Sequence, residues 1–278
     1  TGYVAKEGIT LDLIVTNSLG REIEVTKQWK GTLESNIPPS IYVGLYLNDE
    51  PVDGKYIQLK KAESWKGSFK YLGEGTYTVK ELRETTDSKN AEFTIDNKNY
   101  IGVDGGGSVT IDDVTYDVTY SQGTTTNNKT TYTITNQGSW RMIKKSKSGN
   151  LFLGGAVFTL TQGGSNPVYT GTSVETTGLV TWKDAADSDV DIATITDGIY
   201  TLTEKTAPTG YQPGGTWEII ITNGVPTSIV KTNSDGSIDK SDKGEYENGI
   251  LTFYYENEAL YALPDSGGTG IYGYVLGG

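Results

Sequence analysis

Residues 251–257, with the sequence LTFYYEN, form the stretch that decides the fold class. Successive side chains of a β-strand point to opposite faces, so Phe253, Tyr255 and Asn257 share one face. This face places a carboxamide directly after two aromatic side chains of the expected core. The pattern therefore predicts a half-buried strand that directs a polar group into the protein interior.

The composition extends this β-pattern to the rest of the chain. The 278 residues include 19 tyrosines and 36 glycines; tyrosine suits pleated strands and glycine suits turns. No long window has apolar residues at helical spacing, so we expect an all-β protein. The length predicts two domains, which we place at residues 20–137 and 138–260. Residues 1–19 contain a strand that reaches Asn17, and we interpret it as the last strand of a preceding repeat.

Charge and missing residue types exclude several classes of function. The formal net charge of −12 argues against nucleic acid, which requires a basic surface, and against attachment to anionic membranes. The absence of cysteine and histidine excludes Ser–His–Asp triads, Cys–His dyads, His/Cys zinc sites and disulfides. The acidic stretches 184–191 and 233–242 lack EF-hand spacing; we interpret them as solvated loops, with calcium binding as the alternative. We therefore expect no metal, no cofactor and no enzyme that acts on an external substrate.

An internal repeat of polar residues is the strongest signal in the sequence. Each repeat has a lysine in its first strand, a glutamate in a later strand after Tyr-Thr-x-x, and an asparagine in its last strand. The two sets are Lys27, Glu81 and Asn136, followed by Lys144, Glu204 and Asn257. One such residue on an apolar face is compatible with a satisfied polar group or a strand end that leans into solvent. Six residues in matching order predict a shared role.

Lysine, glutamate and asparagine side chains that are buried together can react with one another. Desolvation favours the neutral amine and the protonated carboxyl over their charged forms. A neutral amine is a nucleophile, and a protonated carboxyl polarises an amide carbonyl and transfers protons. Attack on the carboxamide with loss of ammonia would give a Lys–Asn isopeptide crosslink. By analogy with a disulfide that closes a loop of about a hundred residues, the bond would stabilise the fold by roughly 4–5 kcal/mol.

Several motifs around these residues resemble known families of Gram-positive surface proteins. The runs VTKQW (25–29), YTVKE (77–81) and TITN (133–136) resemble the B-type repeat of collagen-binding adhesins, the Cna B-type domain. The runs LGGAVFTL (153–160) and YTLTEKTAPTGY (200–211) resemble the prealbumin-like, SpaA-like domain of pilins and surface proteins. The resemblance implies two tandem immunoglobulin-like β-sandwich domains, each with a self-formed Lys–Asn bond promoted by a glutamate.

On the matching positions, the resemblance assigns Glu81 and Glu204 as the promoting residues. The bonds would join Lys27 to Asn136 and Lys144 to Asn257. The second unit has Lys144-Lys145 where the family usually has one lysine, and we choose Lys144 because it is in phase with Trp140 and Met142. The closing motif there is Tyr-Glu-Asn, whereas the family usually has Thr-x-Asn.

The segment 261–278 resembles a truncated cell-wall sorting signal. The motif consists of Leu263, Pro264, Asp265, Ser266 and Gly267, and Ser266 stands where the usual signal has threonine. In that family a sortase cuts after the hydroxyl residue and joins it to an amine. The apolar run 271–276 resembles the start of the hydrophobic tail but is far shorter than the ~20 residues that span a bilayer.

These observations favour a structural stalk of a cell-wall-anchored adhesin or ancillary pilin. The expected location is the Gram-positive cell surface, and the expected partners are sortase and peptidoglycan or pilus subunits. The alternative hypothesis is a module that binds a host extracellular-matrix ligand or a glycan. No nucleic acid and no small-molecule substrate is expected in either case.

Overall fold

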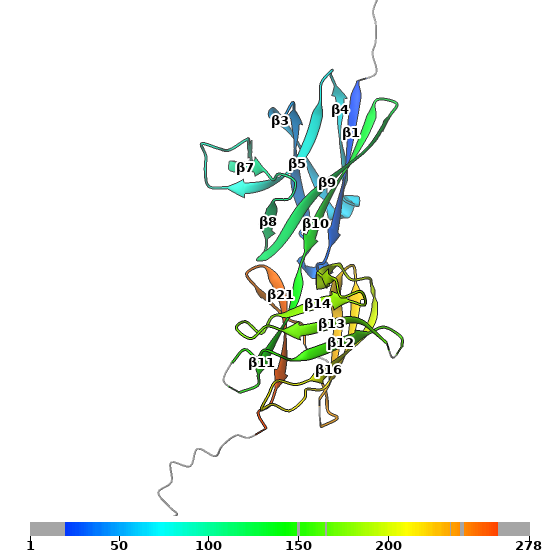
Figure 1. Ribbon diagram of the computed structural model, residues 1–278. Coiled ribbons are helices and arrows are strands. Elements are labelled where there is room, and N and C mark those ends of the chain that lie inside the picture. The colour runs from blue at the N-terminus through cyan, green and yellow to red at the C-terminus, as the bar shows by residue number, and fades with distance from the viewer. Residues whose placement is uncertain (1–19, 149–150, 165, 234, 240–241, 261–278) are drawn as a thin grey trace, which may run out of the picture. The chain divides into compact units, whose positions relative to one another are not determined.

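The structure is a computed structural model that describes residues 20–148, 151–164, 166–233, 235–239 and 242–260. Nearly all regular structure is β, which confirms the all-β class predicted from the sequence (Figure 1). The helices in this part of the chain are single 3-10 turns: η1 (Glu34–Asn36), η2 (Lys61–Glu63) and η3 (Ile192–Thr194). Within the described ranges, no helix has the length and apolar character needed to cross a bilayer.

The chain divides into two compact units. The first comprises Thr1–Lys27, Pro39–Val103 and Tyr120–Ile134, and the second comprises Gln28–Pro38, Asp104–Thr119 and Thr135–Gly278. Residues 1–19, including Asn17, lie outside the described residues, so their assignment to a preceding repeat stays a prediction.

Strands β1 to β10 form two five-stranded sheets. One has the order β4-β1-β10-β9-β8 and the other has the order β3-β2-β5-β7-β6. The strands of the first sheet are β1 (Arg21–Lys30), β4 (Lys66–Leu72), β8 (Ser108–Ile111), β9 (Val114–Thr126) and β10 (Lys129–Gly138). Those of the second sheet are β2 (Ser40–Leu47), β3 (Glu50–Lys60), β5 (Tyr77–Thr85), β6 (Phe93–Ile95) and β7 (Lys98–Gly102).

Alternation in β1 follows the sequence pattern. Ile23, Val25, Lys27 and Trp29 are all buried, whereas the residues between them are partly or fully exposed. In the same way, Val79 and Glu81 of β5 point inward. The period-two rule therefore places a lysine and a glutamate in the interior of the first unit.

Strands β11 to β21 form a three-stranded and an eight-stranded sheet. The smaller sheet has the order β11-β21-β20. Its strands are β11 (Trp140–Ser146), β20 (Glu245–Glu247) and β21 (Ile250–Asn257). The larger sheet has the order β15-β14-β13-β12-β16-β17-β18-β19. Its strands are β12 (Val157–Thr161), β13 (Pro167–Ser173), β14 (Val180–Asp184), β15 (Asp189–Val190), β16 (Gly198–Thr206), β17 (Thr216–Thr222), β18 (Val225–Thr232) and β19 (Ile238–Asp239).

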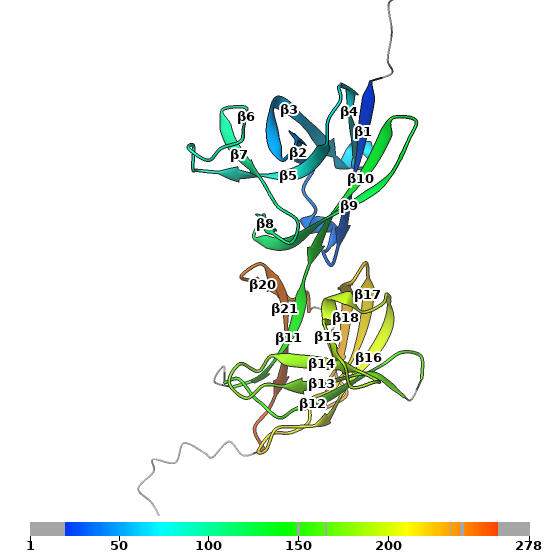
Figure 2. The ribbon, with the colours of Figure 1, turned by 45° about the horizontal axis from the view of Figure 1, so that its top comes forward.

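Strands β11 and β21 lie side by side and run in the same direction (Figure 2). Their register aligns Lys144 with Tyr255 and Ser146 with Asn257. Apolar side chains of both sheets fill one core, which includes Trp140, Met142, Phe158, Leu160, Trp182, Leu202, Trp217, Leu251, Phe253 and Tyr255. The core therefore joins the ends of the domain's sequence to its middle strands.

Tight hairpins connect many of these strands because Asn, Asp and Gly occupy the turns. Both central residues of such a turn have positive φ, as type I′ turns require, and Asn and Asp tolerate this conformation better than other side chains. The pairs are Asn48-Asp49, Asp96-Asn97, Asp112-Asp113, Asn127-Asn128, Asn223-Gly224 and Asn248-Gly249.

Candidate functional site

The two adjacent lysines of β11 have opposite orientations. Lys144 is fully buried and shares the inner face with Trp140 and Met142. Lys145 points the other way, where its ammonium lies 3.4 Å from a Glu256 carboxylate oxygen with 18% of its side chain exposed. Only one lysine of the pair can therefore take part in chemistry inside the core.

Glu204 approaches Lys144 from the opposite sheet. It lies on β16, whose alternation directs Tyr200, Leu202 and Glu204 into the core. Its Oε1 is 4.0 Å from Lys144 Nζ, and neither side chain has exposed surface. A carboxyl group and an amine thus share a dry environment, where electrostatic interactions are much stronger than in water.

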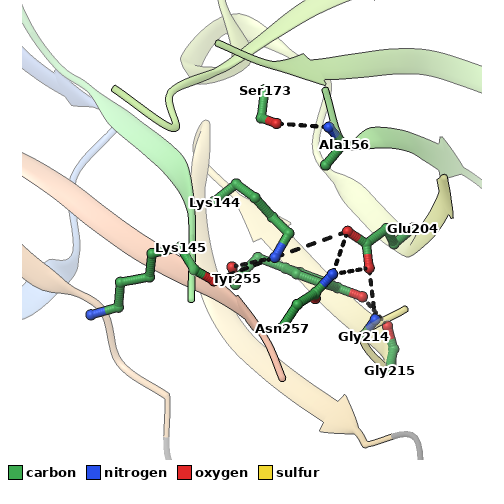
Figure 3. Close-up of polar contacts among 9 residues, drawn as sticks. All are labelled: Lys144, Lys145, Ala156, Ser173, Glu204, Gly214, Gly215, Tyr255 and Asn257. Carbon is green, nitrogen blue, oxygen red and sulfur yellow. Dashed lines mark hydrogen bonds and ion pairs between the residues drawn. The ribbon is translucent and has the colours of Figure 1, made fainter. Parts of the chain in front are cut away.

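Asn257 completes this cluster at the end of β21. Its Nδ2 donates to Glu204 Oε1 at 3.0 Å and to Oε2 at 2.9 Å (Figure 3). Its Oδ1 is buried and has no hydrogen-bond partner among the described residues. The structure therefore brings Lys144, Glu204 and Asn257 together.

The Tyr255 ring lies against the Lys144 amine and is itself packed between other aromatic rings. Nζ lies 5.3 Å from the centre of the Tyr255 ring and donates to the Tyr255 carbonyl at 3.3 Å. That ring stacks on Trp217 and meets the edge of Phe158, with centroid distances of 4.9 Å in both pairs. Burial lowers the pKa of Lys144 to about 8, although the nearby Glu204 carboxylate opposes the shift.

The loop that precedes β17 supplies contacts that sequence reasoning missed. The Gly214 N–H donates to Glu204 Oε2 at 2.6 Å, and the Tyr255 hydroxyl donates to the Gly215 carbonyl. The Gly-Gly pair after Pro213 indicates a turn in the sequence. A pattern of residue types does not indicate which carboxylate a backbone N–H will meet.

The first predicted set begins with an ion pair across the two five-stranded sheets. Lys27 Nζ lies 3.1 Å from Glu81 Oε2, with side-chain exposures of 0% and 1%. Burial lowers the pKa of Lys27 to about 8, and the Glu81 carboxylate acts in the opposite direction. The same two residue types thus share a dry environment in the first unit.

Asn136 and Tyr120 are the other polar groups of interest in this half of the chain. Asn136 has no exposed surface and lies on β10, the strand next to β1 in the sheet. The Tyr120 hydroxyl accepts the Glu81 backbone N–H at 2.9 Å and donates to the Val103 carbonyl at 2.6 Å. Tyr120 therefore fixes the backbone that carries Glu81, a role that its sequence position did not indicate.

Two other features of the sequence are the motif that resembles a sorting signal and the acidic stretches. The motif Leu263, Pro264, Asp265, Ser266 and Gly267 belongs to the undescribed C-terminal segment. In the described part of the chain, no group of three or more acidic side chains is arranged to hold a metal ion.

The buried groups are suited to acyl transfer. A lysine whose pKa is lowered by burial is an activated nucleophile, and the Asn257 carboxamide is an acyl donor. Glu204 contacts the amide and faces the amine, so it can move protons between them. The product of that transfer would be an amide bond between two strands.

Two family models match separate parts of the chain. Residues 23–101 match the Cna protein B-type domain, and residues 138–235 match the SpaA prealbumin-like fold domain. The search of curated proteins found no match.

Solved structures of bacterial surface proteins also align with the chain at low identity. The SpaC pilus adhesin of Lactobacillus rhamnosus GG is 17% identical, with a TM-score of 0.30, and the alignment covers 87% of this chain. The chain spans 44% of that adhesin's length. A single B repeat of the Staphylococcus aureus collagen-binding protein is 19% identical over 84% of this chain and 97% of the repeat, with a TM-score of 0.21.

The minor pilin GBS52 of Streptococcus agalactiae is 14% identical over 88% of this chain and 98% of the pilin, with a TM-score of 0.20. The two family matches cover the stretches that contain Lys27 and Glu81, and Lys144 and Glu204. Residues 23–101 are therefore similar to the Cna protein B-type domain, and residues 138–235 are similar to the SpaA prealbumin-like fold domain.

Proposed function

We propose that this chain is a stalk segment of a Gram-positive cell-wall-anchored adhesin or ancillary pilin, locked by intramolecular Lys–Asn isopeptide bonds. The observation that carries the proposal is the buried cluster of Lys144, Glu204 and Asn257. A polar group of this size is costly to bury without a compensating role. Covalent capture of the lysine by the amide removes both the amine charge and the need to solvate it.

The bond between Lys144 and Asn257 forms by a balanced exchange. The neutral amine attacks the carboxamide carbon, and protonated Glu204 donates to Oδ1, which a rotation of the amide by half a turn brings to the carboxyl. The carboxylate then takes a proton from Nζ and delivers one to Nδ2. The Cγ–Nδ2 bond breaks, ammonia leaves, and Glu204 regains its proton.

The position of this bond suits a protein that carries tension. β11 and β21 are parallel neighbours at the two ends of the domain's sequence. A load that enters at Trp140 and leaves at Asn257 would pass through β11 and the crosslink. Residues 145–256 would lie outside the load path, so their hydrogen bonds would not have to resist it.

The same bond is proposed between Lys27 and Asn136, with Glu81 as the promoting residue. Both reacting residues are buried on neighbouring strands of one sheet, and the Lys27–Glu81 contact of 3.1 Å supports proton transfer. The first and last strands of each predicted domain, 20–137 and 138–260, would then be joined covalently.

The proposed partners follow from the location at the cell surface. The segment Leu263–Gly267 would be the substrate of a sortase, which would join it to peptidoglycan or to a pilus subunit. A host extracellular-matrix ligand is the partner expected from the alternative hypothesis. The chain's own chemistry would be limited to formation of its crosslinks.

Intact-mass spectrometry of the purified chain tests the crosslinks. Each bond releases one ammonia, so the mass should fall by about 17 Da for each bond. The mass deficit is the difference between the mass expected from the variant's sequence and the observed mass. Lys144→Ala should reduce this deficit by one ammonia, whereas the matched variant Lys145→Ala should leave it unchanged. A chain whose mass equals that of its sequence would refute the proposal.

A further inference from the structure

The loop 213–215 contacts the Glu204 carboxyl from the side of β17. Gly214 N–H donates to Oε2 at 2.6 Å. Asn257 Nδ2 donates to both oxygens, at 3.0 Å to Oε1 and 2.9 Å to Oε2, and Oε1 lies 4.0 Å from Lys144 Nζ. The two oxygens of one carboxyl therefore have different surroundings, because only Oε2 receives a backbone donor from this loop.

We propose that Gly214 and Tyr255 are positioning residues for the crosslinking reaction, and that they assign the transferable proton to Glu204 Oε1. This inference rests on the proposed isopeptide function. Oε2 accepts from both Gly214 and Asn257, whereas Oε1 accepts from Asn257. The oxygen with the additional N–H donor is favoured as the carbonyl oxygen of a neutral carboxyl group, since a hydroxyl oxygen is a poorer acceptor. The proton then resides on Oε1, the oxygen nearest the amine.

Space explains why the loop has glycine at this position. A Cβ on Gly214 would lie 2.3 Å from Cε1 and 2.6 Å from Oη of Tyr255. The Tyr255 ring therefore occupies the volume that any other side chain at Gly214 would need. Glycine has no Cβ at this position. For that reason the backbone N–H can approach Glu204 while the Tyr255 ring packs against the loop.

Tyr255 also ties the loop to β21. Its hydroxyl donates to the Gly215 carbonyl, its ring faces Lys144 Nζ at 5.3 Å, and its own carbonyl accepts from that amine. One residue thus links the loop that holds the carboxyl to the strand that holds the amide. Movement of the ring would displace the carboxyl and the amine together.

The experiment follows crosslinking with time in the full chain carrying Asn136→Ala, which leaves only the second bond to form. The chain is made by cell-free translation, and samples are quenched and analysed by intact mass. Gly214→Ala should slow the loss of ammonia roughly twofold to tenfold, the range expected for a hydrogen bond between neutral groups. Tyr255→Phe should slow it less, because the ring remains in place.

The matched control is Gly164→Ala in the same domain. A Cβ there would lie 3.9 Å from the Gln162 carbonyl, an ordinary contact. This variant should react at the parental rate. In a Tyr255→Leu background, Gly214→Ala should have a much smaller effect, since the ring that competes for the space is gone.

The thermal stability of the uncrosslinked chain separates a positioning role from a general packing defect. A positioning role predicts that Gly214→Ala slows the reaction while the uncrosslinked chain, with Asn257→Ala added, keeps most of its thermal stability. A packing defect would lower that thermal stability as well.

The outcomes distinguish this inference from the proposed function. If the parent chain never loses ammonia, the isopeptide function itself is wrong. If the parent reacts and Gly214→Ala reacts at the same rate, the positioning role is wrong and the isopeptide function stands.

Discussion

The two buried lysine–glutamate pairs share residue types and burial but differ in the distance between the amine and the carboxyl. In the first, Glu81 Oε2 lies 3.1 Å from Lys27 Nζ, a direct ion pair. In the second, both oxygens of Glu204 accept from the Asn257 amide, and the amine is 4.0 Å away. The proposed reaction requires the carboxyl to meet the amine and the amide in turn. The carboxyl is therefore closer to the amine in the first pair, and the second pair shows the contact with the amide.

The supports of the two glutamates differ as well. The Glu81 backbone is held by a side chain, the Tyr120 hydroxyl, whereas the Glu204 carboxylate is held by the Gly214 backbone. The first contact fixes the backbone of the strand that carries Glu81. The second fixes the carboxyl itself. Similar chemistry can therefore be supported by different local structures, and variants should affect the two halves of the chain independently.

The largest effects are expected from Glu81→Gln and Glu204→Gln. Glutamine preserves the shape of the side chain but cannot transfer protons. Proton transfer by the glutamate is expected to accelerate the reaction roughly 10²–10⁴-fold. Each variant should therefore lose one bond and keep the other, and lower the free energy of unfolding of its own domain by roughly 4–5 kcal/mol. Peptide mass mapping and denaturant unfolding measure these effects. If either variant abolished both bonds, the independence of the two sites would be wrong.

A smaller effect is expected from pH in a chain that cannot crosslink, the double variant Asn136→Ala and Asn257→Ala. Burial lowers the pKa values of Lys27 and Lys144 from 10.5 to about 8. Between those values the unfolded chain binds more protons than the folded chain, so the free energy of unfolding should rise as pH increases from 8 to 10. The expected gain is roughly 2–3 kcal/mol for each lysine.

Below pH 8 both states hold these lysine protons, and this contribution to the pH dependence should vanish. Above pH 10 the trend should reverse, because burial raises the pKa values of Tyr132 and Tyr255 in the folded state. The crosslinked parent has no free amine at either site and serves as the control. An equal rise between pH 8 and 10 in the parent would contradict the assignment of the effect to these lysines.

Sequence periodicity could place the reacting groups because it depends only on the alternation of a strand. The phase of Trp140 and Met142 selected Lys144 over Lys145, and the structure buries the first and leaves the second partly exposed. The roles of these side chains in a crosslink stay a prediction. The surroundings of Glu204 could not be predicted in this way, since the Gly214 N–H reaches it from a loop whose path no local pattern encodes.

The smallest effect is expected from Tyr120→Phe. The variant leaves the Glu81 N–H without its acceptor and the Val103 carbonyl without its donor, at a cost of roughly 1–3 kcal/mol. Tyr71→Phe is the matched control, because Tyr71 is 92% exposed. Denaturant unfolding in the Asn136→Ala background measures both, and the bond at Lys144 should form normally in each. Equal stability of the two variants would mean that the Tyr120 contacts do not support the first site, and the contrast between a side-chain support and a backbone support would then be lost.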